Sequence, residues 1–175
     1  MSFLNKVKTI LGLVGVIWLV YFASLVLPLK SFGIVPRTLD GLVGILAAPF
    51  LHANLPHLTA NTTALMTFGG ILILLEGKRF WRVLMMVTII TGSLTWLMAR
   101  PANHIGASGV IFGLFGYLLA IGLFRKQFKY ILVSIGVGVV YGGFIFGVLP
   151  TGGGISWESH LAGLVAGGVL AKANG

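Results

Sequence analysis

The chain has 175 residues, of which 57% are hydrophobic and only 9% are charged, with a mean hydropathy of +1.03. A soluble domain carries about 25% charged residues, so this composition excludes an ordinary soluble domain. The absence of cysteine excludes disulfides, thiolate metal sites and a cysteine nucleophile. The net charge of +9 does not indicate a nucleic-acid partner, because the basic residues lie in short clusters between apolar runs.

Apolar runs long enough to cross a bilayer recur along the chain and are separated by short polar or basic segments. The first covers residues 10–29, which is longer than the apolar part of a cleaved signal peptide, so we expect a retained helix. Residues 31–56 are predicted to form an outer first loop. Within it, residues 41–50 are apolar but too short to span, which is typical of an interfacial or re-entrant segment.

Five further spans are predicted, at about residues 57–75, 80–99, 107–124, 130–149 and 155–172. Pro150 and a glycine run at 152–154 close the fifth span of the six. The predicted fold is therefore an all-α membrane protein, a six-transmembrane-helix bundle that forms a single domain over residues 1–175. The 26 glycines fit this fold, because glycine lets helix backbones approach closely in lipid.

The distribution of basic residues predicts the orientation of these spans. Six spans place both termini on one side, together with the second and fourth loops. That side holds most of the Lys and Arg residues: Lys6, Lys8, Lys78, Arg79, Arg82, Arg125, Lys126, Lys129 and Lys172. Because cytoplasmic loops are enriched in basic residues, both termini are predicted to be cytoplasmic. The opposite side holds only Lys30, Arg37 and Arg100.

Three polar clusters fall near the outer ends of different spans. His57 and Asn61 begin span two, Ser108 begins span four, and His160 lies near the start of span six. The topology places all three at a similar depth, although they are scattered over the sequence. Polar groups in a membrane are costly and commonly functional, so the clusters predict one site.

The residue types in these clusters point to acyl transfer. A serine hydroxyl is a weak nucleophile until a base takes its proton, and the histidine pKa suits that role near neutral pH. We therefore expect Ser108 as nucleophile and His160 as base. His57 and Asn61 share a helix face, and with the Ser108 amide they could donate hydrogen bonds to an oxyanion.

The acidic residues are few, and their positions favour a Ser–His dyad over a triad. Asp40, Glu76 and Glu158 are the three acids of the chain. Glu76 is predicted on the opposite side of the membrane. Glu158 is two residues from His160, which directs its side chain to another helix face.

Glycines are predicted to bring the serine and histidine helices together. Gly163 and Gly167 follow His160 at positions i+3 and i+7, and Gly109 and Gly113 lie in the serine helix. Two helices with glycine faces can pack with their backbones nearly in contact. This would place Ser108 within hydrogen-bond reach of His160.

The order and spacing of these motifs resemble those of the rhomboid family of intramembrane serine proteases. The match covers spans two to six, and the motifs that carry it are His52-x4-His57-x3-Asn61, Gly69-Gly70, Gly106-Ala107-Ser108-Gly109 and His160-x2-Gly163-x3-Gly167.

The resemblance implies a role for each matching residue. It implies Ser108 as nucleophile, His160 as its base, and His57, Asn61 and the Ser108 amide as the oxyanion hole. Gly106, Gly109, Gly163 and Gly167 would support the site and its helix packing. The resemblance also implies a six-helix bundle, a cavity that opens outward, and cleavage of transmembrane substrates near their outer boundary.

One departure from the family concerns the residue four positions after the serine. Many relatives carry a tyrosine that stacks on the histidine, and this chain has Phe112 instead. Stacking would survive, and the hydroxyl would be lost. Among the remaining histidines, His52 is expected to tie the outer loop to the bundle, and His104 is expected to be a loop residue.

Other functions fit these residues less well. The histidines form no metal-binding pair of known spacing, so no metal and no cofactor are expected. A transporter or channel would need polar groups along a full path, and here they stop at one face. The main alternative is a catalytically inactive rhomboid-like protein that binds transmembrane clients. The expected partners are transmembrane protein substrates and the lipid bilayer, in a bacterial plasma membrane with the site facing outward.

Overall fold

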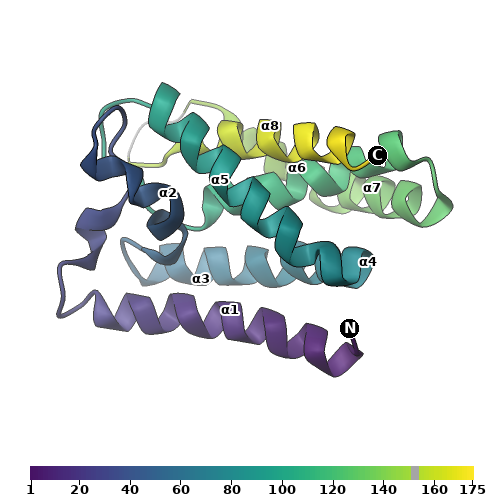
Figure 1. Cartoon of the computed structure of the whole chain (residues 1–175), viewed down its shortest axis with the longest axis horizontal. Helices are drawn as coiled ribbons and strands as arrows, with labels where there is room; N and C mark the ends of the chain where they lie inside the picture. The colour runs from purple at the N-terminus through teal and green to yellow at the C-terminus, as the bar shows by residue number, and fades with distance from the viewer. Residues whose placement is uncertain (151–153) are drawn as a thin grey trace.

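The computed structural model describes residues 1–150 and 154–175, and helices dominate this part of the chain (Figure 1). It contains no strand within those residues, only an isolated antiparallel bridge between Ile34 and His104. The all-helical fold class is therefore confirmed. Of the predicted glycine run at 152–154, only Gly154 belongs to the described residues.

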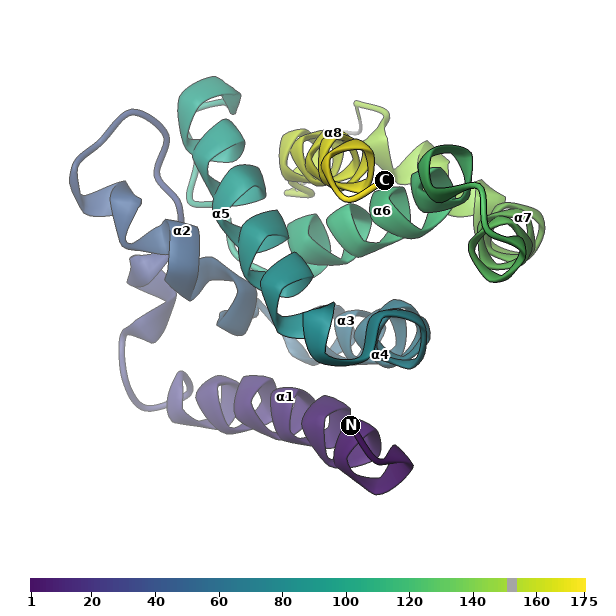
Figure 2. The same ribbon diagram turned by 45° about the vertical axis from the view of Figure 1, so that its right-hand side comes forward.

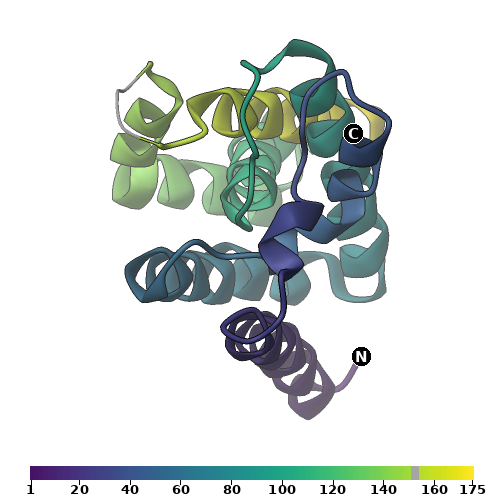
Figure 3. The same ribbon diagram turned by 90° about the vertical axis from the view of Figure 1, so that its left-hand side faces the viewer.

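The first helix, α1 (Phe3–Ala23), begins and ends earlier than the predicted span of residues 10–29. It begins early because the Ser2 hydroxyl accepts a hydrogen bond from Asn5 N at 3.2 Å, which caps the helix. It ends before Pro28, which cannot continue a helix. The helix lies at the edge of the bundle (Figure 3), and large apolar side chains such as Leu19 are exposed along it.

The segment between α1 and α3 folds into short helical turns. These are η1 (Leu29–Phe32), η2 (Asp40–Leu42), α2 (Gly44–Ala47) and η3 (Ala48–Phe50). The segment lies against α5 (Phe80–Met98), as Figure 2 shows. The contact is close, since a Cβ on Gly92 of α5 would lie 2.8 Å from Ile45 Cγ2.

The second predicted span is a continuous helical segment with an irregular middle. It consists of α3 (Leu55–Ala64), a π-helical turn η4 (Leu65–Gly69) and α4 (Gly70–Glu76). The chain reverses at Gly77, which has a φ of +59° that favours glycine, and η5 (Gly77–Arg79) leads into α5.

The remaining helices surround α6 (Ser108–Arg125), which lies at the centre of the bundle (Figure 2). They are α7 (Phe128–Tyr141) and α8 (Trp157–Ala173). The predicted fifth span is α-helical only in its first part, because it tightens into the 3-10 turn η6 (Gly142–Val148) at two adjacent glycines. Glycine has a low helix propensity, which accounts for the change.

By length and composition, four segments of the described chain are candidate membrane spans. They are Phe3–Ala23, Leu55–Met98, Ser108–Arg125 and Phe128–Val148. The segment Leu55–Met98 has 44 residues and contains the reversal at Gly77, and α8 has 17 residues. The prediction of six spans is therefore compatible with this count, which does not by itself establish six.

Glycines hold α6 and α8 together at backbone contact. A Cβ on Gly163 would overlap the carbonyl oxygen of Gly109, and one on Gly167 would overlap that of Gly113. A Cβ on Gly116 would lie 2.5 Å from Leu164 O. The predicted glycine faces are thus in contact, and they fix the separation of the two helices.

A buried ionic network lies at the end of the bundle where α4 ends. Arg125 Nη1 donates to Glu76 Oε1 at 2.9 Å, and Tyr117 Oη donates to the same oxygen at 2.9 Å. Arg125 also donates to Tyr130 Oη and, at 2.8 Å, to the carbonyl of Asn174. The network neutralises Glu76 and ties the C-terminal end of α8 to α6.

The glycine contact predicts a sharp contrast between two neighbouring substitutions. Gly163→Ala should destabilise the protein by about 1–3 kcal/mol, the usual cost of overpacking, because the new Cβ overlaps Gly109 O. Gly168→Ala is the matched control, since nothing lies within 4 Å of its Cβ position. Thermal unfolding in detergent should show a lower midpoint for Gly163→Ala alone. Equal midpoints would contradict the proposed contact.

Candidate functional site

Ser108 is the first residue of α6 and faces a cavity of about 530 Å³. The chain enters this helix through Gly106, whose backbone packs against His57 and Asn61. Its φ is +122°, and a Cβ there would lie 2.6 Å from His57 Cε1 and 3.4 Å from Asn61 Nδ2. Glycine is therefore required at 106 for both conformation and space. As an N-terminal residue of the helix, Ser108 has an amide without an intrahelical partner.

His160 lies in the first turn of α8 with its ring between Ser108 and Gly147. Its Nε2 is 2.9 Å from Ser108 Oγ, and its Nδ1 is 2.8 Å from the carbonyl oxygen of Gly147. A carbonyl can only accept, so Nδ1 carries the proton of the neutral ring. This leaves the Nε2 lone pair free to accept the Ser108 proton, which is the tautomer that a general base needs.

Aromatic stacking fixes the plane of the His160 ring. Phe112 lies parallel to it, with centroids 4.3 Å apart and an interplanar angle of 10°. Phe144 of η6 stacks on the other face of Phe112 at 4.3 Å. The expected stacking of Phe112 on the histidine is present. The stacked Phe112 ring also leaves no room for a side chain at Gly147, because a Cβ there would lie 2.5 Å from Phe112 Cζ.

Asn61 and His57 line the same cavity from α3. Asn61 is 5% exposed, and its Nδ2 has no hydrogen-bond partner among the described residues. A buried amide without a partner costs free energy unless a ligand or water satisfies it. The structure thus brings His57, Asn61, Ser108 and His160 to one cavity, and Asn61 has a donor available there.

The described part of the chain places no carboxylate on the ring nitrogens of His160. Glu158 pairs with Arg100 at 3.2 Å, and Glu76 is bound to Arg125 at the far end of the bundle. This geometry agrees with the prediction that neither Glu76 nor Glu158 contacts His160. The carbonyl of Gly147 occupies the position of a third member, and no sequence motif marks it.

The other two histidines are buried in loops beside the site. His52 is 0% exposed, and its ring centroid lies 5.2 Å from that of His57. His104 Nε2 donates to Arg100 O at 3.0 Å, and its Nδ1 lies 2.6 Å from Ser156 Oγ. His104 therefore links the loop before α6 to the residue that precedes α8.

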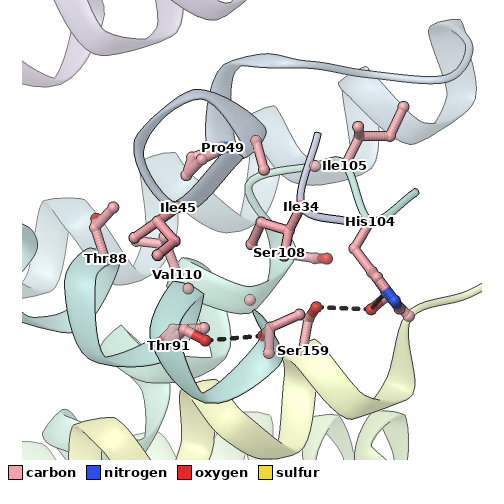
Figure 4. Close-up of a pocket in the computed structure, with 16 residues that line it drawn as sticks. Ile34, Ile45, Pro49, Thr88, Thr91, His104, Ile105, Ser108, Val110 and Ser159 are labelled. Atoms are coloured by element: carbon pink, nitrogen blue, oxygen red, sulfur yellow. Dashed lines mark hydrogen bonds between the residues drawn. The ribbon is translucent and has the colours of Figure 1, made fainter. Parts of the chain in front are cut away.

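Ser108 also lines a second and much smaller cavity, of about 30 Å³ (Figure 4). Thr91 of α5, His104 and Ser159 contribute polar groups to its wall, and Ile34 and Ile45 contribute apolar ones. Thr91 Oγ1 is buried there without a hydrogen-bond partner among the described residues. The serine therefore lies between two cavities of very different size.

This arrangement is suited to nucleophilic attack by a serine. It supplies a hydroxyl, a base with the required tautomer, and a free amide donor across the cavity. No group of three or more His, Cys, Asp or Glu side chains that could hold a metal ion occurs among the described residues. Gly147 contacts His160 and Phe144 stacks on Phe112, but neither belongs to a recognisable sequence motif. The only sequence signal for them is their position shortly before the sixth span.

Comparison with known proteins gives a consistent result. The family model named Rhomboid domain matches residues 39–173. An uncharacterized protein of Mycobacterium tuberculosis is 43% identical over 148 residues, which are 79% of this chain and 62% of that protein. A similar protein of Mycobacterium leprae is 43% identical over 141 residues, 75% of this chain and 56% of that protein. The chain thus spans about three fifths of these mycobacterial relatives.

A relative with a stated activity is also found. The rhomboid protease GluP of Bacillus subtilis is 32% identical over 130 residues, which are 71% of this chain and 24% of GluP.

The burial of His52 predicts a pH dependence of stability. Burial, with nearby His57 as a smaller cause, lowers the pKa of His52 from 6.5 to about 4. Between these values the unfolded chain binds more protons at this residue, so stability falls as the pH falls from 6.5 towards 4. The thermal midpoint of His52→Gln should decline less than that of the native protein over this range. Parallel declines would show that His52 is not responsible.

Proposed function

The chain belongs to the rhomboid family, and from this premise we propose that it is a serine endopeptidase that cleaves transmembrane protein segments within the bilayer. The observation that carries the proposal is the 2.9 Å contact between Ser108 Oγ and His160 Nε2, with the opposite ring nitrogen donating to Gly147 O. A serine with a correctly oriented base is the minimum equipment for acyl transfer.

The proposed reaction has two halves. His160 Nε2 takes the Ser108 proton as Oγ forms a bond with the carbonyl carbon of the substrate peptide. The C–N bond then breaks as His160 gives that proton to the leaving amine, which leaves an acyl-enzyme. In the second half His160 takes a proton from water as the water oxygen bonds to the ester carbon. The bond between that carbon and Ser108 Oγ then breaks, and Oγ recovers a proton from His160.

An oxyanion develops in each half and needs donors placed in advance. We assign this role to Asn61 Nδ2, His57 and the Ser108 amide. Asn61 supports the assignment best, because its Nδ2 is buried beside the cavity with no partner among the described residues. A donor that no protein group occupies can bond to the oxyanion without first breaking a hydrogen bond within the protein, which favours the transition state.

We further propose the membrane arrangement that the sequence predicts. Six helices cross the bilayer, both termini are cytoplasmic, and the cavity opens outward. Transmembrane protein substrates would enter from the bilayer and unwind near the outer boundary. Unwinding a helix in lipid exposes backbone groups without partners, so substrates with small or helix-breaking residues should be favoured. Neither a metal nor a cofactor takes part in this scheme.

The proposal predicts a reactive serine that depends on its histidine. A fluorophosphonate probe should label the detergent-solubilised protein, and labelling should disappear in Ser108→Ala and fall to near background in His160→Ala. Thermal unfolding serves as the folding control. A folded native protein that is not labelled would favour the inactive, client-binding alternative. Labelling that persists in Ser108→Ala would mean that another residue is the nucleophile.

The oxyanion assignment predicts a graded loss of activity. Asn61→Ala should lower kcat on a transmembrane substrate by about 10²–10³, the usual effect of removing one oxyanion donor. Thr63→Ala is the matched control from the same helix, since Thr63 is exposed and bonds only to the carbonyl of Thr59. It should retain native activity in reconstituted vesicles. Full activity in Asn61→Ala would remove Asn61 from the mechanism.

A further inference from the structure

An apolar cleft of about 270 Å³ lies between α1 and α5, and its lining shares no residue with that of the catalytic cavity. We refer to it as the α1–α5 cleft. It is closed at one end by the short helices of the first loop. The side chains that define it are Leu13 and Ile17 of α1, Trp81 and Met85 of α5, and Ala107 and Val110 at the start of α6.

The floor of the cleft is buried and its rim is exposed. Ile17 and Val110 are 3% and 6% exposed, whereas Trp81 and Met85 are about half exposed, at 50% and 54%. The opening therefore faces outward from the bundle, towards the lipid in a membrane. Water gains little in such an apolar space, and an empty space loses dispersion contacts with its walls. The natural occupant is hydrocarbon.

The size of the cleft indicates what kind of hydrocarbon fits. Along α1 the cleft is lined from Leu13 to Ile17, which is about 6 Å of helix at 1.5 Å per residue and well under the hydrocarbon core of about 30 Å. A cleft of this length serves a single leaflet. A partner helix would need the full thickness and a diameter of about 10 Å, which a volume of about 270 Å³ does not provide. A lipid acyl chain meets both limits.

Two lysines precede the lining residues of α1 and α5 in the chain, and neither of them lines the cleft itself. Lys6 precedes Leu13 by seven residues on α1, which places both on one helix face. Lys78 of η5 precedes Trp81 by three residues, and its neighbour Glu76 is bound to Arg125 and Tyr117. Lys6 Nζ lies 3.4 Å from Leu74 O, next to this turn. Among the described residues neither lysine forms an ion pair, so their charges are available to an anion.

We propose that the α1–α5 cleft binds one anionic phospholipid, with an acyl chain between α1 and α5 and the phosphate against Lys6 and Lys78. The chain would reach Ala107 and Val110, which flank Ser108 in the first turn of α6. A bound lipid would then support the helix end that presents the serine. Binding itself does not depend on the proposed protease activity.

Native mass spectrometry of the delipidated, full-length protein tests the proposal directly. Phosphatidylglycerol and phosphatidylcholine with identical acyl chains are titrated separately, and the affinity of the first bound lipid is measured. The native protein should prefer phosphatidylglycerol by about tenfold or more. A basic residue near a membrane surface contributes about fivefold to anionic lipid binding, so Lys6→Gln with Lys78→Gln should remove the preference. Lys126→Gln with Lys129→Gln, at the same end of the bundle, should retain it.

A second pair of variants tests the position of the acyl chain. Leu13→Trp fills the cleft from α1 and should weaken binding of the first lipid at least tenfold. Leu19→Trp is the matched control on the same helix, because Leu19 is 69% exposed and points away from the cleft. Met85→Trp, which fills the cleft from α5, replaces Leu13→Trp if that variant fails to fold by thermal unfolding.

Two results would overturn the proposal. Equal affinities in Leu13→Trp and Leu19→Trp would mean that the lipid binds around the bundle and not in the cleft. Equal affinities for the two lipids in the native protein would mean that the lysines do not select an anionic headgroup. Neither measurement uses proteolysis, so a failure here remains distinct from a failure of the proposed function.

Discussion

The close contact between α6 and α8 is the constraint on which the site depends. Gly163 and Gly167 lie against the backbone at Gly109 and Gly113, where no side chain fits. In lipid, helices gain little from apolar burial, and association relies on close packing of this kind. The contact sets the separation that places His160 Nε2 at 2.9 Å from Ser108 Oγ. A wider spacing would leave a serine and a histidine without a hydrogen bond.

A neutral carbonyl orients His160, the proposed base of this site. Gly147 O accepts the Nδ1 proton of His160, and Phe112 holds the ring plane by stacking. A buried carboxylate could do the same work, but placing an isolated charge in a low-dielectric interior is costly. A buried carboxylate does occur at the opposite end of the bundle, where Arg125 and Tyr117 donate hydrogen bonds to Glu76. At the end of the bundle that holds His160, Glu158 pairs with Arg100 and does not contact the histidine ring.

Asn61 differs from several threonines of the bundle in how its side-chain polar group is bonded. Thr62, Thr88 and Thr95 each bond to the carbonyl four residues earlier in their helix. Asn61 Nδ2 has no such partner among the described residues, although it is buried. A satisfied amide would be more stable but could not strengthen its hydrogen bonding during a reaction.

The sequence by itself determined the membrane class, the glycine faces and the polar residues that gather in one cavity, because hydropathy and residue type are local properties. It predicted most helices after α1 to within a few residues, although the α-helical part of the fifth span ends at Tyr141. The helix α1 begins and ends earlier than predicted, because Ser2 caps its start and Pro28 cannot continue it. Only the tertiary structure decided what orients His160. Gly147 and Phe144 carry no motif, and their roles arise from packing between η6 and the start of α8. The lipid-facing cleft likewise exists only where separate helices diverge.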